Sequence, residues 1–189
     1  MFKLEIREVQ VRQQSIVLIG FMGVGKTTIG KLVAKKLYRD FVDIDKEIEN
    51  FFEISTTDIF KLHGEAIFRD YEKKMIQSFS KQKLKIISIG GGAYMQAEVR
   101  EACLANCTVL FLDVAWEEWK ERLNILIDSR PILQSKNIDE IEELFHIRQG
   151  AYSLNNSTLT VNYQSAEEVA DYIVESLKLA WDLYDPQPL

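Results

Sequence analysis

The chain has 189 residues, of which 47% are hydrophobic, and a chain of this size buries one sizeable core without needing a second domain. Its net charge of -6 argues against broad binding along a nucleic-acid backbone, and no segment is long and apolar enough to span a bilayer. Residues 1–14 also lack the apolar core of a signal peptide. We therefore expect one cytoplasmic domain over residues 1–189 that is monomeric and binds neither nucleic acid nor membrane.

Five short apolar runs, rich in branched side chains, predict five β-strands. They cover residues 15–19, 41–44, 86–89, 108–112 and 159–161. The longer stretches between them have a helical period, and this alternation is typical of a parallel sheet with helices on both faces. Because ligands bind at the carboxyl ends of the strands in such α/β sheets, we expect the functional residues there.

The first predicted strand runs into "GFMGVGKTTIG", which fits the phosphate-loop pattern G-x-x-x-x-G-K-S/T at every fixed position. The glycines let the backbone fold around phosphate, Lys26 is placed to reach the β and γ phosphates, and Thr27 offers a hydroxyl to Mg²⁺. The alternative, a glycine-rich turn with a solvated lysine, leaves this spacing unexplained. The predicted nucleotide-binding residues are Gly23, Val24, Gly25, Lys26, Thr27 and Thr28.

The second predicted strand ends in "FVDID", in which two carboxylates stand at alternate positions and so on one face of a strand. Carboxylates this close repel each other unless a cation or a substrate proton lies beside them. We expect Asp43 in the shell of a Mg²⁺ ion and Asp45 as the acceptor of a hydrogen bond from a substrate hydroxyl. The alternative is that one of the pair caps the following helix, predicted over residues 46–51.

The third predicted strand runs into three consecutive glycines, Gly90, Gly91 and Gly92. A bare triple glycine can be only a flexible turn, but beside a phosphate loop it lets a small ligand touch the backbone. The sequence lacks an N-K-x-D guanine signature and a D-x-x-G after this strand. These observations favour transfer to a small molecule over a GTPase switch.

Two cysteines, Cys103 and Cys107, stand four residues apart in a predicted helix. This spacing differs from the C-x-x-C of metal and redox sites, and the two histidines of the chain are distant in sequence. We therefore expect two small buried thiols in a reducing compartment.

Three arginines are candidate ligands for an anion. Arg148 lies in the apolar stripe of a helix predicted to begin at Asn137, where it either pairs with a buried glutamate or clamps a substrate carboxylate or phosphate. Arg69 lies beside the core stripe of its helix, and its simpler interpretation is a pair with Glu72. Arg130 precedes a proline in a predicted loop. This loop either closes over the nucleotide or is an ordinary connection between helices, and the residue spacing does not decide between the two.

The ordered set of motifs resembles the shikimate kinase family. After the phosphate loop come "FVDIDKEIE", "GEAIFRDYE", "SIGGGA", "VLFLD" and "SRPIL", and then Arg148 followed by Tyr152. Single motifs of this set occur in other small P-loop kinases, whereas the collinear order from about residue 16 to about residue 152 is specific.

The resemblance implies a three-layer α/β P-loop kinase fold, in which helices flank a five-stranded parallel sheet, with a substrate-binding insertion near 46–79 and a lid near 128–137. The implied reaction converts ATP and shikimate to ADP and shikimate 3-phosphate on the route to chorismate. On the acceptor side, the resemblance implies that Asp45 orients or deprotonates the 3-hydroxyl, that Arg69 and Arg148 hold the carboxylate, and that Gly90 to Gly92 present backbone to the ring. On the nucleotide side, it implies that Lys26 and Arg130 neutralise the transferring phosphoryl group and that Thr27 and Asp43 hold Mg²⁺.

Two departures from the family pattern concern single positions. Family members often have a glycine near the position of Glu53, at the turn between the first two helices of the insertion. Many relatives carry a basic residue after the last strand, whereas this chain has no lysine or arginine between Arg148 and Lys178.

Two other functions fit parts of the pattern. A gluconate-type kinase shares the phosphate loop without needing the other motifs. A catalytically silent nucleotide-binding module is the second alternative. The intact Lys26, Asp45 and Arg148 argue against silence, because charged groups that face inward are costly to keep without a ligand.

Overall fold

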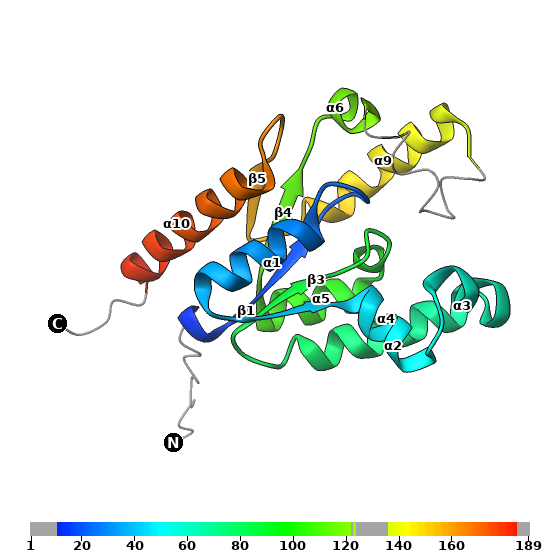
Figure 1. Cartoon of the computed structure of the whole chain (residues 1–189), viewed down its shortest axis with the longest axis horizontal. Helices are drawn as coiled ribbons and strands as arrows, with labels where there is room; N and C mark the ends of the chain where they lie inside the picture. Colours follow the sequence, from blue (N-terminus) through cyan, green and yellow to red (C-terminus); the bar gives the residue numbers. More distant parts are fainter. Residues whose placement is uncertain (1–10, 122, 124–135, 185–189) are drawn as a thin grey trace, which may run out of the picture.

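The computed structural model describes residues 11–121, 123 and 136–184. Five strands form one sheet in the order β2-β3-β1-β4-β5, and every neighbouring pair is parallel (Figure 1). The strands are β1 (Ser15–Ile19), β2 (Asp40–Asp43), β3 (Lys85–Ser88), β4 (Cys107–Asp113) and β5 (Ser157–Thr160). The predicted five-stranded parallel sheet is therefore confirmed.

Helices surround this sheet. They are α1 (Lys26–Leu37), α2 (Ile44–Phe52), α3 (Thr56–His63), α4 (Glu65–Phe79), α5 (Ala97–Asn106), α6 (Trp116–Glu121), α9 (Ile138–Tyr152) and α10 (Ala166–Tyr184), with 3-10 turns η1 (Val11–Gln13) and η2 (Ala93–Met95). Helices α1 and α10 pack against each other, while α5 packs on β4 and α4 packs on α5. The long connection between β2 and β3 contains α2, α3 and α4, which contact one another.

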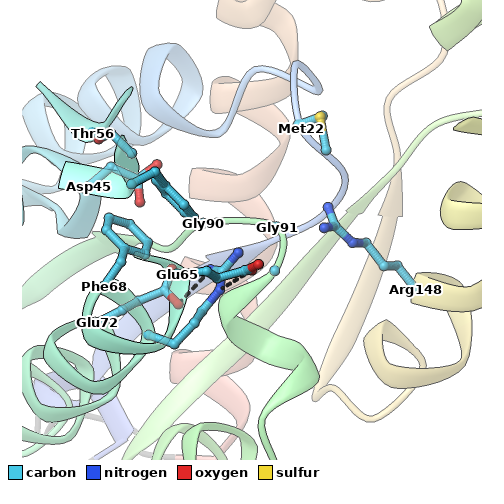
Figure 2. Close-up of a pocket in the computed structure, with 12 residues that line it drawn as sticks. Met22, Asp45, Thr56, Glu65, Phe68, Glu72, Gly90, Gly91 and Arg148 are labelled. Carbon is cyan, nitrogen blue, oxygen red and sulfur yellow. Dashed lines mark hydrogen bonds and ion pairs between the residues drawn. The ribbon is translucent and has the colours of Figure 1, made fainter. Parts of the chain in front are cut away.

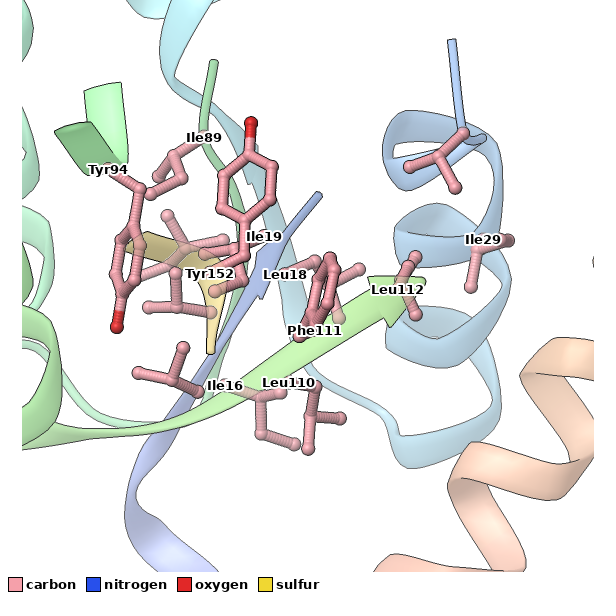
Figure 3. Packing of buried hydrophobic residues seen from close by; sticks show 14 of the residues in the cluster. Ile16, Leu18, Ile19, Ile29, Ile89, Tyr94, Leu110, Phe111, Leu112 and Tyr152 are labelled. Carbon is pink, nitrogen blue, oxygen red and sulfur yellow. The ribbon is translucent and has the colours of Figure 1, made fainter. Parts of the chain in front are cut away.

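The central strand β1 explains why the sequence forms this sheet. All five of its residues are buried, and it lies between β3 and β4. A parallel strand covered on both faces reads as a continuous apolar run, which is the pattern that predicted it. Figure 3 shows its side chains packed between α1 on one side and the buried Tyr94 and Tyr152 on the other. This core holds the carboxyl end of β1, where the phosphate loop begins.

Several predicted strand limits shift by one or two residues. Strand β2 ends at Asp43, because Ile44 already belongs to α2, and β3 ends at Ser88. Strand β5 covers Ser157–Thr160, where residues 159–161 were expected, because three of its four residues are exposed and the apolar pattern marks only its end.

The cysteine pair is only partly as predicted. Cys103 lies in α5, but Cys107 is the first residue of β4, so the two do not share a helix. Both thiols are free and buried, as expected. Burial raises the pKa of each thiol to about 12, which makes both poor nucleophiles.

Two predicted regions remain to be placed, the lid and the substrate-binding insertion. The predicted lid, which includes Arg130, lies mainly outside the described residues. The substrate-binding role of the segment from α2 to α4 stays a prediction. Among the described helices, none combines the length and the apolar character needed to cross a membrane.

Glu53 ends α2 in a left-handed conformation with φ of 58°. A side chain with a Cβ atom pays about 1 kcal/mol for this conformation, whereas glycine adopts it freely. We predict that Glu53→Gly raises the free energy of unfolding by about 1 kcal/mol, measured by urea denaturation. Glu53→Ala, which removes the same carboxylate but keeps the Cβ, serves as the control and should bring no gain. Equal free energies of unfolding for Glu53→Gly and Glu53→Ala would contradict the predicted backbone strain at this position.

Candidate active site

The loop between β1 and α1 has a backbone that requires glycine. Gly20, Gly23 and Gly25 have φ angles of 145°, 77° and 102°. A Cβ atom on Gly20 would also lie 2.6 Å from the main-chain oxygen of Leu112. The loop is anchored from outside by Trp119, whose indole Nε1 donates a hydrogen bond to the carbonyl of Met22 at 2.6 Å. The loop shape is therefore built into the fold.

Most of the predicted nucleotide-binding residues line a cavity of about 260 Å³ at this loop. Gly23, Gly25, Lys26, Thr27 and Thr28 line it, whereas Val24 is only 2% exposed and packs into the core. The Lys26 ammonium group donates hydrogen bonds to the carbonyls of Gly20 at 2.8 Å and Phe21 at 3.0 Å. The amine therefore lies within the loop that is predicted to bind the phosphates of the nucleotide.

The two residues predicted to hold Mg²⁺ are in contact. Thr27 Oγ1 donates a hydrogen bond to Asp43 Oδ2 at 2.7 Å, and both residues line the same cavity. Across the residues that the structure describes, no three His, Cys, Asp or Glu side chains group to hold a metal ion. A hydroxyl and a single carboxylate nevertheless fit Mg²⁺, which prefers oxygen ligands and usually takes the rest of its shell from phosphates and water.

A second cavity, of about 310 Å³, lies between α2, α3, α4, the triple-glycine loop and α9 (Figure 2). Arg148 reaches it from α9, opposite the side chains that α4 contributes. Its lining residues are Met22, Asp45, Thr56, Phe60, Glu65, Phe68, Arg69, Glu72, Gly90, Gly91, Gly92 and Arg148. The two cavities share Met22, Asp45, Gly90 and Gly91, so they meet at the Asp45 carboxylate.

Asp45 stands in the first turn of α2 and not on a strand. The predicted alternation of Asp43 and Asp45 along one strand face is therefore wrong, although both side chains line the phosphate cavity. The capping alternative is wrong as well, because Asp43 occupies the N-cap position and makes no side-chain cap hydrogen bond. Asp45 lies in the first turn, where the positive end of the helix favours a carboxylate, and this position is compatible with a ligand role.

The triple glycine provides space rather than unusual backbone angles, since the glycines with positive φ in the described chain are Gly20, Gly23, Gly25 and Gly64. Each of its residues faces a different polar side chain. A Cβ atom would lie 2.9 Å from Glu72 Oε1 at Gly90, 3.1 Å from the Tyr152 hydroxyl at Gly91 and 2.7 Å from Arg69 at Gly92. The loop was predicted to admit a ligand, and it also admits these side chains.

Arg148 is 5% exposed and makes no ion pair with any described residue. The predicted alternative of a buried pair with a glutamate is therefore wrong within the described chain. Its guanidinium carbon lies 5.4 Å from the centre of the Phe21 ring, and its Nε atom has no hydrogen-bond partner in the described part of the chain. Burial lowers the pKa of Arg148. A buried cation at a cavity wall that makes no direct ion pair with a described residue is suited to receive an anion.

Arg69 does form the predicted pair with Glu72, with 2.7 Å between Nη1 and Oε2, and it also contacts Glu65 at 3.2 Å. Burial lowers the pKa of Arg69, but the attraction of the two glutamates outweighs it and the net shift is upward. The paired guanidinium still lines the second cavity. The pairing and a ligand role are therefore compatible.

Glu72 is the residue of this cavity whose importance the sequence did not reveal. It is 0% exposed, and none of the described residues makes a hydrogen bond to its Oε1 atom. Burial raises its pKa to about 7 and the neighbouring Asp45 adds to the shift, while Arg69 and Arg148 oppose it. Its spacing from Arg69 indicates only an ordinary helical ion pair. The burial of Glu72 results from the packing of α4 against α2 and α5, which the spacing does not reveal.

The raised pKa of Glu72 predicts a pH-dependent stability. The folded chain keeps this proton after the unfolded chain has lost it, so the contribution is full below about pH 4.5 and is lost as the pH rises to about 7. A shift of this size corresponds to about 3 kcal/mol. We expect the unfolding free energy of the wild type, relative to Glu72→Gln, to fall by most of this amount between pH 5 and pH 8 in urea titrations.

The control for this stability measurement is Glu65→Gln, which removes the more exposed partner of the same arginine. Its stability relative to the wild type should not change over this pH range. A constant difference between wild type and Glu72→Gln from pH 5 to pH 8 would contradict the buried titration of Glu72.

Comparison with known proteins identifies the family. The family model described as shikimate kinase matches residues 22–178. The chain belongs to the shikimate kinase family. The shikimate kinase of Bacillus pumilus (strain SAFR-032) is 57% identical over 179 residues, which are 94% of this chain and 97% of that protein. The shikimate kinase of Bacillus subtilis (strain 168) is 55% identical over 181 residues, covering 95% and 97% of the two chains.

A solved structure agrees with this family assignment. The shikimate kinase from Acinetobacter baumannii, determined in complex with shikimate, has a TM-score of 0.82 and 31% identity, and the match covers 89% of this chain and 94% of that chain. The family resemblance read from the motifs is thus confirmed, and the enzyme is a kinase. Membership in this family decides against the gluconate-type kinase and against the silent nucleotide-binding module.

Proposed function

We propose that this shikimate kinase transfers the γ-phosphoryl group of ATP to the 3-hydroxyl of shikimate and that the transfer takes place at Asp45. The observation that carries the proposal is the meeting of the phosphate cavity and the second cavity at Asp45, Gly90 and Gly91. A nucleotide in one cavity and a hydroxylated acid in the other would place donor and acceptor on either side of this carboxylate. Holding two reactants in line is the main source of rate in phosphoryl transfer.

On the nucleotide side, the backbone N–H groups of the loop and the positive end of α1 would bind the phosphates. Lys26 would turn from the carbonyls of Gly20 and Phe21 toward the β and γ phosphates. Thr27 and Asp43 would hold Mg²⁺, which supplies positive charge to the phosphate oxygens when it is bound. Arg130 would add a further positive charge, as the family resemblance implies.

On the acceptor side, Arg148 and Arg69 would hold the shikimate carboxylate. A guanidinium group binds a carboxylate through two parallel hydrogen bonds, and Arg148 is buried at 5% exposure beside the glycine loop. The backbone of Gly90 to Gly92 would then contact the ring. With the carboxylate fixed at one end of the cavity, one hydroxyl of the ring faces Asp45 at the other end.

Asp45 would accept a hydrogen bond from the reacting hydroxyl and take its proton as the new bond to the γ-phosphorus forms, while the bond from that phosphorus to the bridging oxygen breaks and ADP leaves. Because the transition state of phosphoryl transfer is loose, little basicity is needed and orientation of the hydroxyl carries most of the effect. The second cavity also contains apolar walls, Phe60 and Phe68, that exclude water from the acceptor.

We also propose that the enzyme is a cytoplasmic monomer. Two free, buried thiols support a reducing environment. Light scattering of the purified protein tests the monomeric state.

The proposed reaction is tested by ADP release from MgATP with shikimate, with gluconate and with no acceptor. Release that depends on shikimate supports the proposal. Release with gluconate alone would overturn the assignment of the second cavity, and no release in any sample would overturn the proposed chemistry.

A further inference from the structure

Tyr152 connects two parts of the acceptor site that are far apart in the sequence. It is the last residue of α9, one helical turn after Arg148, and it is fully buried. Its hydroxyl donates a hydrogen bond to the carbonyl oxygen of Gly91 at 2.6 Å. This hydroxyl therefore joins the triple-glycine loop to α9.

The same hydroxyl lies beside the Arg148 guanidinium group. A Cβ atom placed on Gly91 would be 3.1 Å from the Tyr152 hydroxyl and 3.2 Å from Arg148 Nη1, so both groups border the same small space. Burial lowers the pKa of Arg148, and the electrostatic interaction with Tyr152 partly offsets this shift. Because the hydroxyl donates its proton to the Gly91 carbonyl, its oxygen can act toward the guanidinium group only as an acceptor.

Within the part of the chain that the structure describes, few other contacts hold Arg148 in place. The Phe21 ring lies against one face of the guanidinium group at 5.4 Å, and Nε has no hydrogen-bond partner among these residues. An aromatic face attracts a cation but does not set its rotation in the plane, whereas a hydrogen bond does. Tyr152 itself is held by its ring, which packs 5.2 Å from the ring of Phe111 on β4.

We propose that Tyr152 is a positioning residue for shikimate binding, setting the orientation of Arg148 relative to the glycine loop through its hydroxyl. The inference rests on the proposed role of Arg148 as the carboxylate clamp. A guanidinium group binds a carboxylate well only in a narrow range of orientations. Loss of the hydroxyl would remove the polar group that borders Arg148 at Gly91 and would leave the Gly91 carbonyl without its donor.

The test is Tyr152→Phe, which keeps the buried ring. We expect its KM for shikimate to rise about tenfold, with kcat and the KM for ATP each within about twofold of the wild type, because a hydrogen bond to a charged group typically contributes about this much. In the Arg148→Ala background the same substitution should add no further increase, since the hydroxyl acts through that arginine.

Tyr94→Phe is the matched control. Tyr94 is equally buried, and its ring centre lies 6.5 Å from that of Tyr152. Its hydroxyl also donates to a main-chain oxygen, that of Leu154 at 2.5 Å, and Figure 3 shows the two hydroxyls pointing in opposite directions. Both variants should lose similar thermal stability, but only Tyr152→Phe should raise the KM for shikimate.

Two results would overturn the inference while leaving the clamp intact. One is a KM for shikimate in Tyr152→Phe that stays within about twofold of the wild type although Arg148→Ala raises it. The other is an equal rise in Tyr94→Phe, which would indicate a general effect of packing. An unchanged KM in Arg148→Ala would overturn the clamp itself, and the inference with it.

Discussion

Asp45→Asn lowers kcat by about 100-fold or more, while the affinity for ATP changes by less than about threefold. Asparagine keeps the shape of the side chain but removes its negative charge and its ability to take a proton. The carboxylate stands where the two cavities meet, so its loss affects the reacting hydroxyl and not the phosphate loop. Steady-state kinetics and calorimetric titration with a non-hydrolysable ATP analogue measure the two quantities.

Asp40→Asn is the control for this substitution. Asp40 lies at the start of β2, its side chain is 76% exposed, and it pairs with Lys85 outside both cavities. Its replacement should leave kcat unchanged. Equal losses of kcat and of ATP affinity in Asp45→Asn would contradict the placement of Asp45 at the acceptor hydroxyl.

Arg148→Ala raises the KM for shikimate by about 100-fold and leaves the affinity for ATP unchanged. Truncating one partner of a buried charged hydrogen-bond pair costs about 2–5 kcal/mol, and about 1.4 kcal/mol corresponds to a factor of ten. Because Arg148 has no ion-pair partner among the described residues, its removal leaves no carboxylate there without a counter-ion. Thermal stability should therefore not fall as it would after breaking a buried ion pair.

Arg100→Ala supplies the arginine control. Arg100 lies on α5, donates hydrogen bonds to the carbonyls of Tyr94 at 2.9 Å and Met95 at 2.8 Å, and lines neither cavity. It should leave both substrates unaffected. A shikimate KM that stays at the wild-type value in Arg148→Ala, or an ATP affinity that falls in parallel, would contradict the carboxylate clamp.

Features that depend on neighbouring residues in the sequence were predictable. The phosphate loop is a contiguous motif whose glycines set its backbone, and the apolar runs of β1 and β4 reflect burial on both faces of a sheet. The edge strand β5 is largely exposed, so its limits were less clear. The spacing of Cys103 and Cys107 fits a helix but does not show where that helix ends. In the structure, α5 ends at Asn106, just before Cys107.

The site was predictable in its charged residues and less so in what surrounds them. Arg148 was predictable because it lies in the apolar stripe of a helix, where burying a charged side chain costs free energy and so indicates a ligand or a partner. The burial of Glu72 and the hydrogen bond from Tyr152 to Gly91 arise from the packing of separate elements, which no local spacing reveals. The predicted acceptor role of Asp45 relied on a strand that includes this residue. In the structure, α2 begins at Ile44, so Asp45 lies in a helix.

A crystal structure of the enzyme with shikimate bound tests the central claim most directly. The account predicts the carboxylate between Arg69 and Arg148 and the 3-hydroxyl within hydrogen-bond distance of the Asp45 carboxylate. Shikimate bound in the reverse orientation, or outside the cavity that these three residues line, would contradict it.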